Sequence, residues 1–131
     1  MKALDTNILI RFLMRDDEYQ AEKVFELFID AQDRKDKFFV PAVVLMELLW
    51  VLEFVYEISR EDILKAVEDL LCLAILEFEN REAVIRFLNL ARKYKTELSD
   101  LFIASISKER GCEKTLTFDK KASKCNLFEL M

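Results

Sequence analysis

Residues 38–52 read FFVPAVVLMELLWVL, and Glu47 is the single charged residue in this stretch. Its first part, Phe38–Val40, is too short for a helix and does not alternate with polar residues, which is typical of a strand covered on both faces. The part after Pro41 is predicted to form an apolar helix. A buried strand that leads into an apolar helix indicates an α/β architecture.

The same succession of short apolar runs and amphipathic helices extends along the chain. Apolar residues recur at helical spacing in three segments, which begin at Ala21, Ile63 and Val84. The other short runs are predicted to be strands: Lys2–Leu4, Leu73–Phe78, Thr115–Phe118 and Leu127–Leu130. Because parallel neighbours need crossover connections, this order predicts a largely parallel central sheet of four to five short strands flanked by helices. No linker or repeat divides residues 1–131, which we expect to form a single domain.

The composition excludes several kinds of catalytic site. The chain contains no His, which rules out Ser-His-Asp and Cys-His nucleophiles and a histidine zinc helix. It contains one Gly, whereas dinucleotide fingerprints and phosphate loops need several positions without a Cβ atom. The side chains that remain for chemistry are mostly carboxylates.

Cysteine usage and hydropathy indicate a cytoplasmic protein. Cys72, Cys112 and Cys125 are odd in number and form no C-x-x-C pair, so we expect reduced thiols in the core. The longest charge-free apolar run, Phe38–Met46, is far shorter than the roughly 20 residues that span a bilayer. The N-terminus lacks a signal-peptide pattern, and neither secretion nor a membrane location is expected.

The net charge of −5 conceals an asymmetry along the chain. Residues 1–80 carry 9 basic and 18 acidic side chains, whereas residues 81–124 carry 11 basic and 6 acidic ones. The second part could line a path for phosphates, because a nucleic acid responds to the local potential. Solvated helix faces are the simpler interpretation. The residues concerned are Arg86, Arg92, Lys93, Lys95, Lys108, Arg110, Lys114, Lys120, Lys121 and Lys124.

Three acids occupy predicted strand ends or helix starts. Asp5 follows the first strand and can simply cap the next helix, and Asp100 lies in a first helical turn, where the macrodipole favours an acid. Asp119 follows the strand that contains Thr117, and the two side chains point the same way if the strand continues. Asp119 could also be no more than a strand-to-turn residue. Because ligand crevices lie beyond the carboxyl ends of parallel strands, all three acids can face a site.

Glu47 is the most informative acid. Glu53 and Glu57 share one face of the predicted helix, whereas Glu47 points roughly 100° away from them and does not belong to that solvent-facing stripe. An ionised Glu in apolar surroundings costs several kcal/mol unless a cation or hydrogen-bond donors compensate it. A partly exposed helix edge or a salt bridge to an arginine is the structural alternative, but the placement favours a site.

Four converging carboxylates need a counter-ion. Without one they repel one another and raise their pKa values. A hard divalent cation, Mg²⁺ or Mn²⁺, prefers oxygen ligands and suits an acidic pocket without His or thiolate. Such a site can activate a water for attack on phosphorus, and it can therefore hydrolyse a phosphodiester without histidine.

Four motifs together resemble the signature blocks of PIN-domain ribonucleases, and most of all those of VapC-like toxins of type II toxin–antitoxin pairs. They are LDTN at residues 4–7, VVLMELLW at 43–50, SDLFIAS at 99–105 and TFD at 117–119. The resemblance covers essentially the whole chain. It implies a parallel sheet flanked by helices and a Mg²⁺- or Mn²⁺-dependent endoribonuclease specific for single-stranded RNA. It also implies a homodimer and inhibition by a small antitoxin protein.

The resemblance also implies roles for individual residues. The acids of the metal site would be Asp5, Glu47, Asp100 and Asp119. Asn7 and Thr117 would orient ligands or the attacking water, and Thr6 would support the turn after the first strand. Many relatives place a further acid shortly after the fourth one, whereas Lys120 and Lys121 stand there in this chain. These lysines can instead contact a phosphate.

Two other functions remain open at this point. A receiver-like domain would also bind Mg²⁺ in an acidic pocket and would accept a phosphoryl group on an aspartate. Such domains usually carry an acidic pair after the first strand and a lysine before a late proline, whereas the single proline here is Pro41. A non-catalytic binding module on the same scaffold is the other alternative, and the presence of all four acids argues against it.

Overall fold

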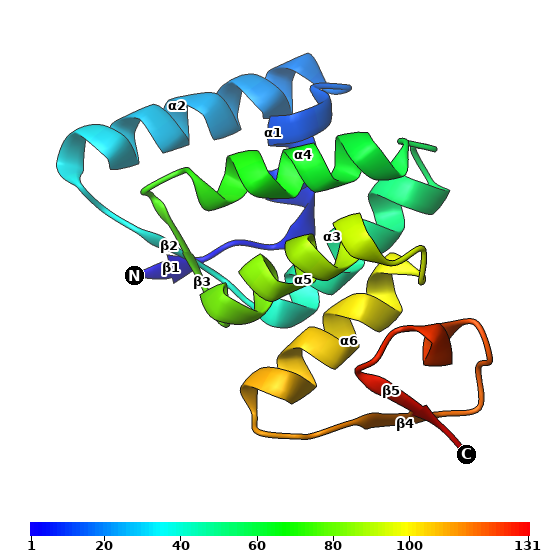
Figure 1. Ribbon diagram of the computed structural model, residues 1–131. Helices are drawn as coiled ribbons and strands as arrows, with labels where there is room; N and C mark the ends of the chain where they lie inside the picture. Colours follow the sequence, from blue (N-terminus) through cyan, green and yellow to red (C-terminus); the bar gives the residue numbers. More distant parts are fainter. The chain divides into compact units, whose positions relative to one another are not determined.

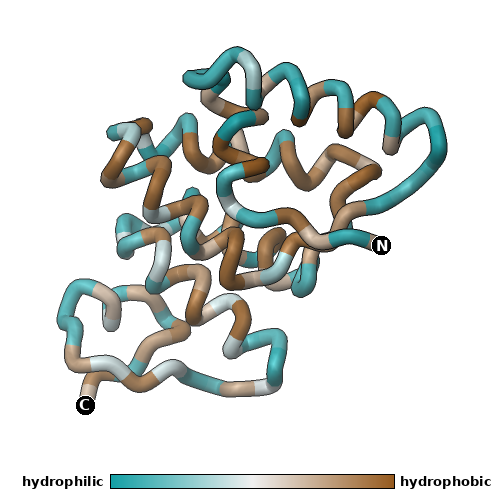
Figure 2. Tube along the Cα trace, turned by 180° about the vertical axis from the view of Figure 1, so that it is seen from behind, coloured by the Kyte–Doolittle hydropathy of each residue, from teal (hydrophilic) through white to brown (hydrophobic).

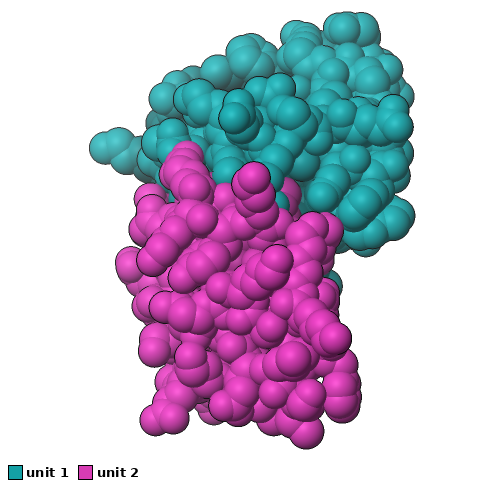
Figure 3. Space-filling model, turned by 45° about the vertical axis from the view of Figure 1, so that its right-hand side comes forward, with its two compact units in different colours: residues 1–79 teal, residues 80–131 magenta.

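The computed structural model describes every residue from Met1 to Met131, and the chain forms two compact units (Figure 1). Unit 1 comprises residues 1–79 and unit 2 comprises residues 80–131, which are coloured separately in Figure 3. Unit 1 contains a three-stranded sheet and four helices. Unit 2 contains two helices, a two-stranded sheet and a short 3₁₀ helix.

The sheet of unit 1 consists of three short strands. They are β1 (Lys2–Ala3), β2 (Phe38–Val40) and β3 (Leu76–Phe78). β2 lies in the middle and pairs in parallel with both neighbours, so that Phe38 is level with Lys2 on one side and with Leu76 on the other. Phe38 and Val40 are buried, as the apolar run at this position predicts. Each parallel pair requires a crossover, which the helices provide.

Four helices connect and follow the strands of unit 1. They are α1 (Thr6–Met14), α2 (Glu18–Arg34), α3 (Ala42–Phe54) and α4 (Arg60–Leu71). Asp17 caps α2 and Ser59 caps α4, each by accepting a backbone N–H of the first turn. α1 and α2 end at Arg15 and Lys35, which lie in the left-handed region with φ values of 51° and 60°. The two helix ends therefore adopt a conformation that usually favours glycine.

The two longest helices of unit 1 bury their side chains differently. Hydrophilic and hydrophobic segments alternate along α2 in Figure 2, because one stripe of this helix is buried and the other sides are exposed. α3 is apolar on nearly all sides, and its buried side chains are Leu45, Leu48, Leu49 and Leu52. Val43, Trp50 and Phe54 are apolar as well but lie exposed. The apolar sequence of α3 therefore does not mean that every face of this helix is buried.

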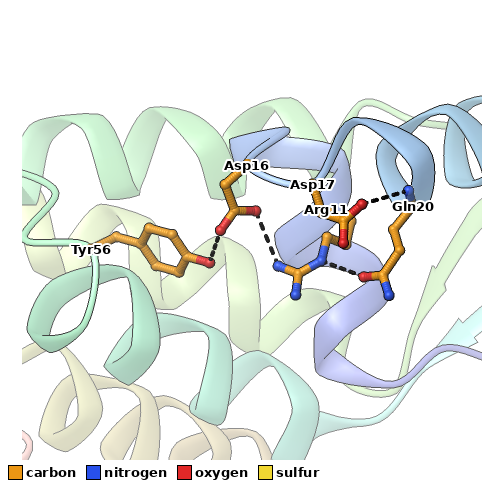
Figure 4. A network of polar contacts seen from close by, with 5 residues as sticks. All are labelled: Arg11, Asp16, Asp17, Gln20 and Tyr56. Carbon is orange, nitrogen blue, oxygen red and sulfur yellow. Dashed lines mark hydrogen bonds and ion pairs between the residues drawn. The ribbon is translucent and has the colours of Figure 1, made fainter.

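A polar network ties the corner between α1 and α2 to the segment after α3 (Figure 4). The Arg11 guanidinium donates to Asp16 Oδ1 at 3.0 Å and to Gln20 Oε1 at 2.6 Å. The Tyr56 hydroxyl donates to Asp16 Oδ2 at 2.7 Å. This hydrogen bond, together with the charge of Arg11, lowers the pKa of Asp16, and the same bond raises the pKa of Tyr56. The network fixes the end of α1 relative to the end of α3.

Unit 2 begins with a pair of helices and ends with a small sheet. Its elements are α5 (Arg81–Lys93), α6 (Leu98–Glu109), β4 (Thr115–Thr117), the 3₁₀ helix η1 (Ala122–Lys124) and β5 (Phe128–Leu130). α5 packs on α6 through Phe87 and Phe102, whose ring centroids are 5.7 Å apart in an edge-to-face arrangement. β4 and β5 run side by side in parallel near the C-terminus (Figure 1). The backbone N–H of Met131 extends this pairing by donating to the Thr117 carbonyl at 2.8 Å.

The predicted α/β fold with parallel strands is confirmed. All five predicted runs contain a strand, and these strands form two sheets of three and two. The run Leu73–Phe78 contains a shorter strand than predicted, because Leu76 first closes a turn by donating its N–H to the Leu73 carbonyl. The strand predicted over Thr115–Phe118 ends at Thr117. The runs at Lys2–Leu4 and Leu127–Leu130 each lose one residue.

The cysteine prediction is partly wrong. All three cysteines are unpaired, as expected, and Cys125 is buried. Cys72 and Cys112 are exposed, so they are not core thiols. Both follow the end of a helix, where the chain turns at the surface and an apolar neighbour in the sequence does not imply burial. None of the helices combines the length and apolar character needed to cross a bilayer.

We expect Tyr56→Phe to lower the melting temperature near pH 7 and to have a smaller effect near pH 3. The reason is that a lowered pKa of Asp16 contributes stability above the ordinary pKa of this group, 3.8, and the contribution is lost as the pH falls through the folded-state value. Removal of the Tyr56 hydroxyl returns the Asp16 pKa toward 3.8 and reduces that contribution.

Thermal unfolding followed by circular dichroism at the two pH values checks this. Tyr19→Phe is the matched control, because the Tyr19 side chain is exposed and its hydroxyl makes no hydrogen bond. An equal loss of stability for Tyr56→Phe at both pH values would contradict the role assigned to the ion pair and its hydrogen bonds.

Candidate active site

Asp5 lies where the chain leaves β1 and enters α1. The N–H of Leu4 donates to the Phe39 carbonyl at 2.9 Å, which fixes the preceding backbone against β2. Asp5 Oδ1 then accepts the N–H of Asn7 at 2.8 Å and caps the helix. The side chains of Asp5 and Asn7 are exposed, whereas Thr6 is buried. The second carboxylate oxygen of Asp5 makes no hydrogen bond and can take a ligand.

A further acid, Glu79, holds the beginning of α3. Glu79 Oε1 accepts the N–H of Ala42 at 2.9 Å, and the backbone N–H of Glu79 donates to the Val40 carbonyl at 3.0 Å. Pro41 precedes α3 and provides no side-chain acceptor, so Glu79 supplies the missing cap from the neighbouring strand. The sequence prediction missed this residue, although Glu79 follows β3 just as Asp5 follows β1.

Glu47 lies within α3, as predicted, but its side chain is exposed. The expectation that apolar neighbours enclose it is therefore wrong. The reason is that Val43 and Trp50, one turn before and one turn after Glu47, belong to the apolar face that α3 leaves exposed. Glu57 lies outside the helix, which ends at Phe54, so Glu53 and Glu57 do not form the solvent stripe used in that comparison.

Asp100 lies in the first turn of α6, half-buried, with no hydrogen bond or ion pair to its carboxylate. Burial raises the pKa of Asp100, and the negative charges of Asp119 and Glu97 raise it further. Glu97 itself forms an ion pair with Lys121 at 3.7 Å. Asp100 is thus a half-buried carboxylate with no hydrogen-bond donor or cation as partner.

Asp119 lies in the turn after β4 and is exposed. Its Oδ1 accepts the N–H groups of Lys121 at 2.8 Å and Ala122 at 3.3 Å, and it thereby caps η1. The Thr117 hydroxyl accepts the N–H of Asp119 at 2.9 Å. Because β4 ends at Thr117, the expected alignment of the Thr117 hydroxyl with the Asp119 carboxylate along a continued strand does not occur. Thr117 instead holds the backbone that carries the carboxylate.

The predicted site residues divide between the two units. Asp5, Asn7 and Glu47 belong to unit 1, in which α1 contacts α3. The other three residues, Asp100, Thr117 and Asp119, belong to unit 2, in which Asp100 and Asp119 interact electrostatically. Neither unit by itself gathers three or more acidic or cysteine side chains as a metal site. The donors are all oxygen atoms, which matches the preference of Mg²⁺ or Mn²⁺.

The basic side chains of unit 2 are mostly exposed. Arg86 is half-buried and forms an ion pair with Glu109, and Arg110 follows α6 at the surface. Lys114 donates to the Asn126 carbonyl and so braces the turn before β4. The other side chains of this set are exposed: Arg92, Lys93, Lys95, Lys108, Lys120, Lys121 and Lys124. Of these, Lys95, Lys108, Lys120 and Lys124 form no ion pair and are available to an anionic ligand.

Comparison with known proteins identifies a protein family that this chain matches and one protein of similar sequence. The model of the PIN domain family matches residues 2–126. A VapC ribonuclease of Aquifex aeolicus (strain VF5) is similar to this chain, with 29% identity over 124 residues. The aligned part covers 95% of this chain and 91% of that protein.

We expect Glu79→Gln to destabilise the protein by less than Glu79→Ala, which should cost about 1 kcal/mol, the usual effect of losing a helix N-cap. The amide oxygen of Gln can still accept the Ala42 N–H, whereas Ala leaves it without a protein acceptor. Chemical denaturation measures the difference. Glu77→Ala on β3, two residues before Glu79, is the control, since Glu77 is exposed and its side chain makes no hydrogen bond or ion pair. If both alanine variants are equally stable, Glu79 does not cap α3.

We expect Asp100→Asn to raise the melting temperature of the metal-free protein near pH 7 and to have little effect near pH 3. A raised pKa means that ionisation of Asp100 is disfavoured in the folded state, so stability falls as the pH rises through the ordinary value of 3.8 toward the folded-state value. The Asn side chain carries no charge and avoids this loss.

Scanning calorimetry in the presence of a chelator checks this expectation. The matched control is Glu82→Gln, because Glu82 lies in the first turn of α5 and is exposed. Its charge is favoured by the helix macrodipole, and its removal should leave the melting temperature unchanged or slightly lower. A lower melting temperature for Asp100→Asn near pH 7 would show that the carboxylate is compensated.

Proposed function

Because the chain belongs to the PIN-domain family, we propose that it is a metal-dependent endoribonuclease that cleaves single-stranded RNA and acts as the toxin of a toxin–antitoxin pair. The name of its relative, VapC ribonuclease, supports a ribonuclease activity. The observation that carries the proposal is Asp100, a half-buried carboxylate without a hydrogen bond, whose pKa is raised by burial and by the charges of Asp119 and Glu97. A site of this kind becomes stable when a divalent cation neutralises it.

In this proposal, Asp5, Asp100 and Asp119 are ligands of Mg²⁺ or Mn²⁺, and Glu47 is a further ligand, directly or through a water. Asp5 and Asp119 support this assignment because each uses only Oδ1 to accept backbone N–H groups. Their caps hold the carboxylates in place while the second oxygen stays open. When bound, the ion supplies the charge that activates a water and neutralises the phosphoryl oxygens.

The neighbouring polar residues would position the carboxylates and the attacking water. Thr117 accepts the Asp119 N–H and fixes the turn that carries this acid. Thr6 is buried in the first turn of α1, directly after Asp5. The side chain of Asn7 is exposed and makes no hydrogen bond of its own, so it is available to a ligand or a water. A buried Thr and a capped turn both limit movement of the acids.

The exposed basic side chains of unit 2 would bind the phosphates of the RNA. Residues 81–124 carry 11 basic and 6 acidic side chains, so their local charge is positive although the whole chain is acidic. Five of these cations are exposed and form no ion pair, so they can meet an anion: Lys95, Lys108, Arg110, Lys120 and Lys124. Phosphate contacts position a nucleic acid without selecting its sequence. We therefore expect RNA binding that weakens with added salt.

The proposed partners are an antitoxin protein and a second copy of the chain, in the cytoplasm. An apolar groove of about 340 Å³ in unit 1 offers a surface for a protein. Its lining residues are Phe12, Phe25, Phe28, Ile29, Gln32, Cys72, Leu73, Ala74 and Ile75. The family favours a nuclease over a receiver-like phosphoacceptor. A non-catalytic module on the same scaffold is distinguished by an RNA cleavage experiment.

We expect Asp5→Asn and Asp100→Asn each to lower the rate of RNA cleavage by at least about 100-fold, since loss of a residue that only orients a metal ligand already costs 10- to 100-fold. Asn retains the ability to cap α1 at position 5, so the fold should persist. Cleavage of a fluorescently labelled single-stranded RNA in Mg²⁺ or Mn²⁺ measures the effect, and circular dichroism verifies folding.

Asp62→Asn is the control for cleavage, because Asp62 also occupies the first turn of a helix but lies on α4. It should cleave as fast as the parent protein. A chelator should abolish cleavage by the parent, and Mn²⁺ should restore it. If Asp100→Asn cleaves RNA at the parental rate, or if the chelator has no effect, the proposed metal site is wrong.

A further inference from the structure

Phe118 stands between Thr117 and Asp119 and exposes 82% of its surface, more than any other large apolar side chain of the protein. It contacts no other aromatic ring and no cation. Burial of an aromatic ring stabilises a folded protein, and the exposed ring of Phe118 does not contribute in this way. Single exposed apolar residues are common, but this one directly precedes a proposed metal ligand. Its position therefore warrants a functional explanation.

The backbone that carries Phe118 is held on both sides. The Thr117 hydroxyl accepts the N–H of Asp119 at 2.9 Å, and Asp119 Oδ1 accepts the N–H of Lys121 at 2.8 Å. On the preceding side, the Thr117 carbonyl accepts the N–H of Met131 at 2.8 Å. The ring thus projects from a braced turn. A braced ring loses less conformational entropy on binding a ligand than a ring on a loose loop.

Several lysines follow Phe118 closely in the sequence. Lys120 is exposed and its ammonium group forms no ion pair. Lys121 makes one long contact, at 3.7 Å, with Glu97, and Lys124 is exposed at the end of η1. An exposed aromatic ring beside free cations is the combination by which proteins bind single-stranded nucleic acids, with the ring stacking on a base and the cations contacting phosphates.

We propose that Phe118 is a stacking platform for a base of the RNA substrate and that Lys120 contacts a phosphate of the same strand. This inference rests on the proposed ribonuclease function. Because Phe118 directly precedes Asp119 in the chain, a base stacked on its ring would belong to a nucleotide near the proposed metal site. Stacking accepts every base, so Phe118 positions the strand without selecting its sequence.

Protein association is the competing explanation for this surface. Leu116 lies in β4, two residues before Phe118, and exposes 60% of its surface. A second copy of the chain could cover both side chains. The free lysines favour RNA, because like charges at a self-complementary contact would repel one another. The two explanations differ in whether the aromatic ring itself is needed.

The experiment compares Phe118→Leu, which removes the ring but keeps an apolar side chain, with Phe118→Trp, which keeps a ring. Binding of a short single-stranded oligoribonucleotide of mixed sequence, labelled with 2-aminopurine, is measured by fluorescence in a chelator so that no metal-dependent cleavage occurs. Steady-state cleavage in Mg²⁺ gives KM and kcat. Leu116→Ala is the matched control, because Leu116 is the neighbouring exposed apolar residue in β4, and light scattering gives the oligomeric state.

We expect Phe118→Leu to raise the Kd for RNA by roughly five- to 150-fold and to raise KM accordingly, with a smaller effect on kcat. Phe118→Trp and Leu116→Ala should stay within about twofold of the parent, because neither removes a stacking ring. The 2-aminopurine signal should change on binding to the parent and to Phe118→Trp, and less on binding to Phe118→Leu.

An unchanged Kd for Phe118→Leu in a parent that cleaves RNA would overturn the platform and leave the ribonuclease function intact. A parent that neither binds nor cleaves RNA would overturn both. If Phe118→Leu and Leu116→Ala both change the oligomeric state and leave the Kd unchanged, the surface is a contact between copies of the chain.

Discussion

Parallel pairing of very short strands is the constraint on which the rest of the structure depends. A chain that leaves one strand must cross over before it can pair again in the same direction, so every strand end becomes a turn into the next element. These turns need hydrogen-bond acceptors for the first N–H groups of that next element. Asp5 after β1 and Asp119 after β4 accept such N–H groups, whereas Glu79 after β3 accepts the first N–H of α3, which follows the neighbouring strand β2. The topology thus places carboxylates at the carboxyl ends of the strands.

Capping and metal binding are compatible uses of the same carboxylate. A cap uses one oxygen and restrains the rotamer, and the other oxygen keeps its lone pairs. Asp5 and Asp119 are in this situation, whereas Asp100 has no such partner and is partly withdrawn from water. The folded chain therefore stores unfavourable electrostatic energy at Asp100. We infer that binding energy of a cation would offset it, which links ion binding to protein stability.

Most of the fold can be predicted from the sequence, because three-residue apolar runs between amphipathic helices have few other interpretations. The first and last residues of the strands cannot be predicted in this way, since local turns such as the one closed by Leu73 and Leu76 shorten the strands. The sequence correctly places Asp100 in a first helical turn and Asp119 after a strand. The sequence left open whether Glu47 lies in an apolar site or at an exposed helix edge, because an all-apolar helix does not reveal which of its faces stays exposed, and the structure shows it exposed. The capping role of Glu79 depends on a contact with Ala42, which is 37 residues away, and no local pattern indicates it.

The left-handed ends of α1 and α2 have a thermodynamic consequence. Arg15 and Lys35 occupy a backbone region that costs a side-chain-bearing residue roughly 1–2 kcal/mol, yet each places a cation near the negative end of a helix. Arg15 also lies 3.7 Å from both Glu18 and Glu22. Ions in solution screen these attractions but do not relieve the backbone strain. The C-terminal ends of α1 and α2 therefore become less stable as ionic strength rises. A glycine in place of Arg15 or Lys35 carries no charge, so that helix end would not depend on ionic strength in this way.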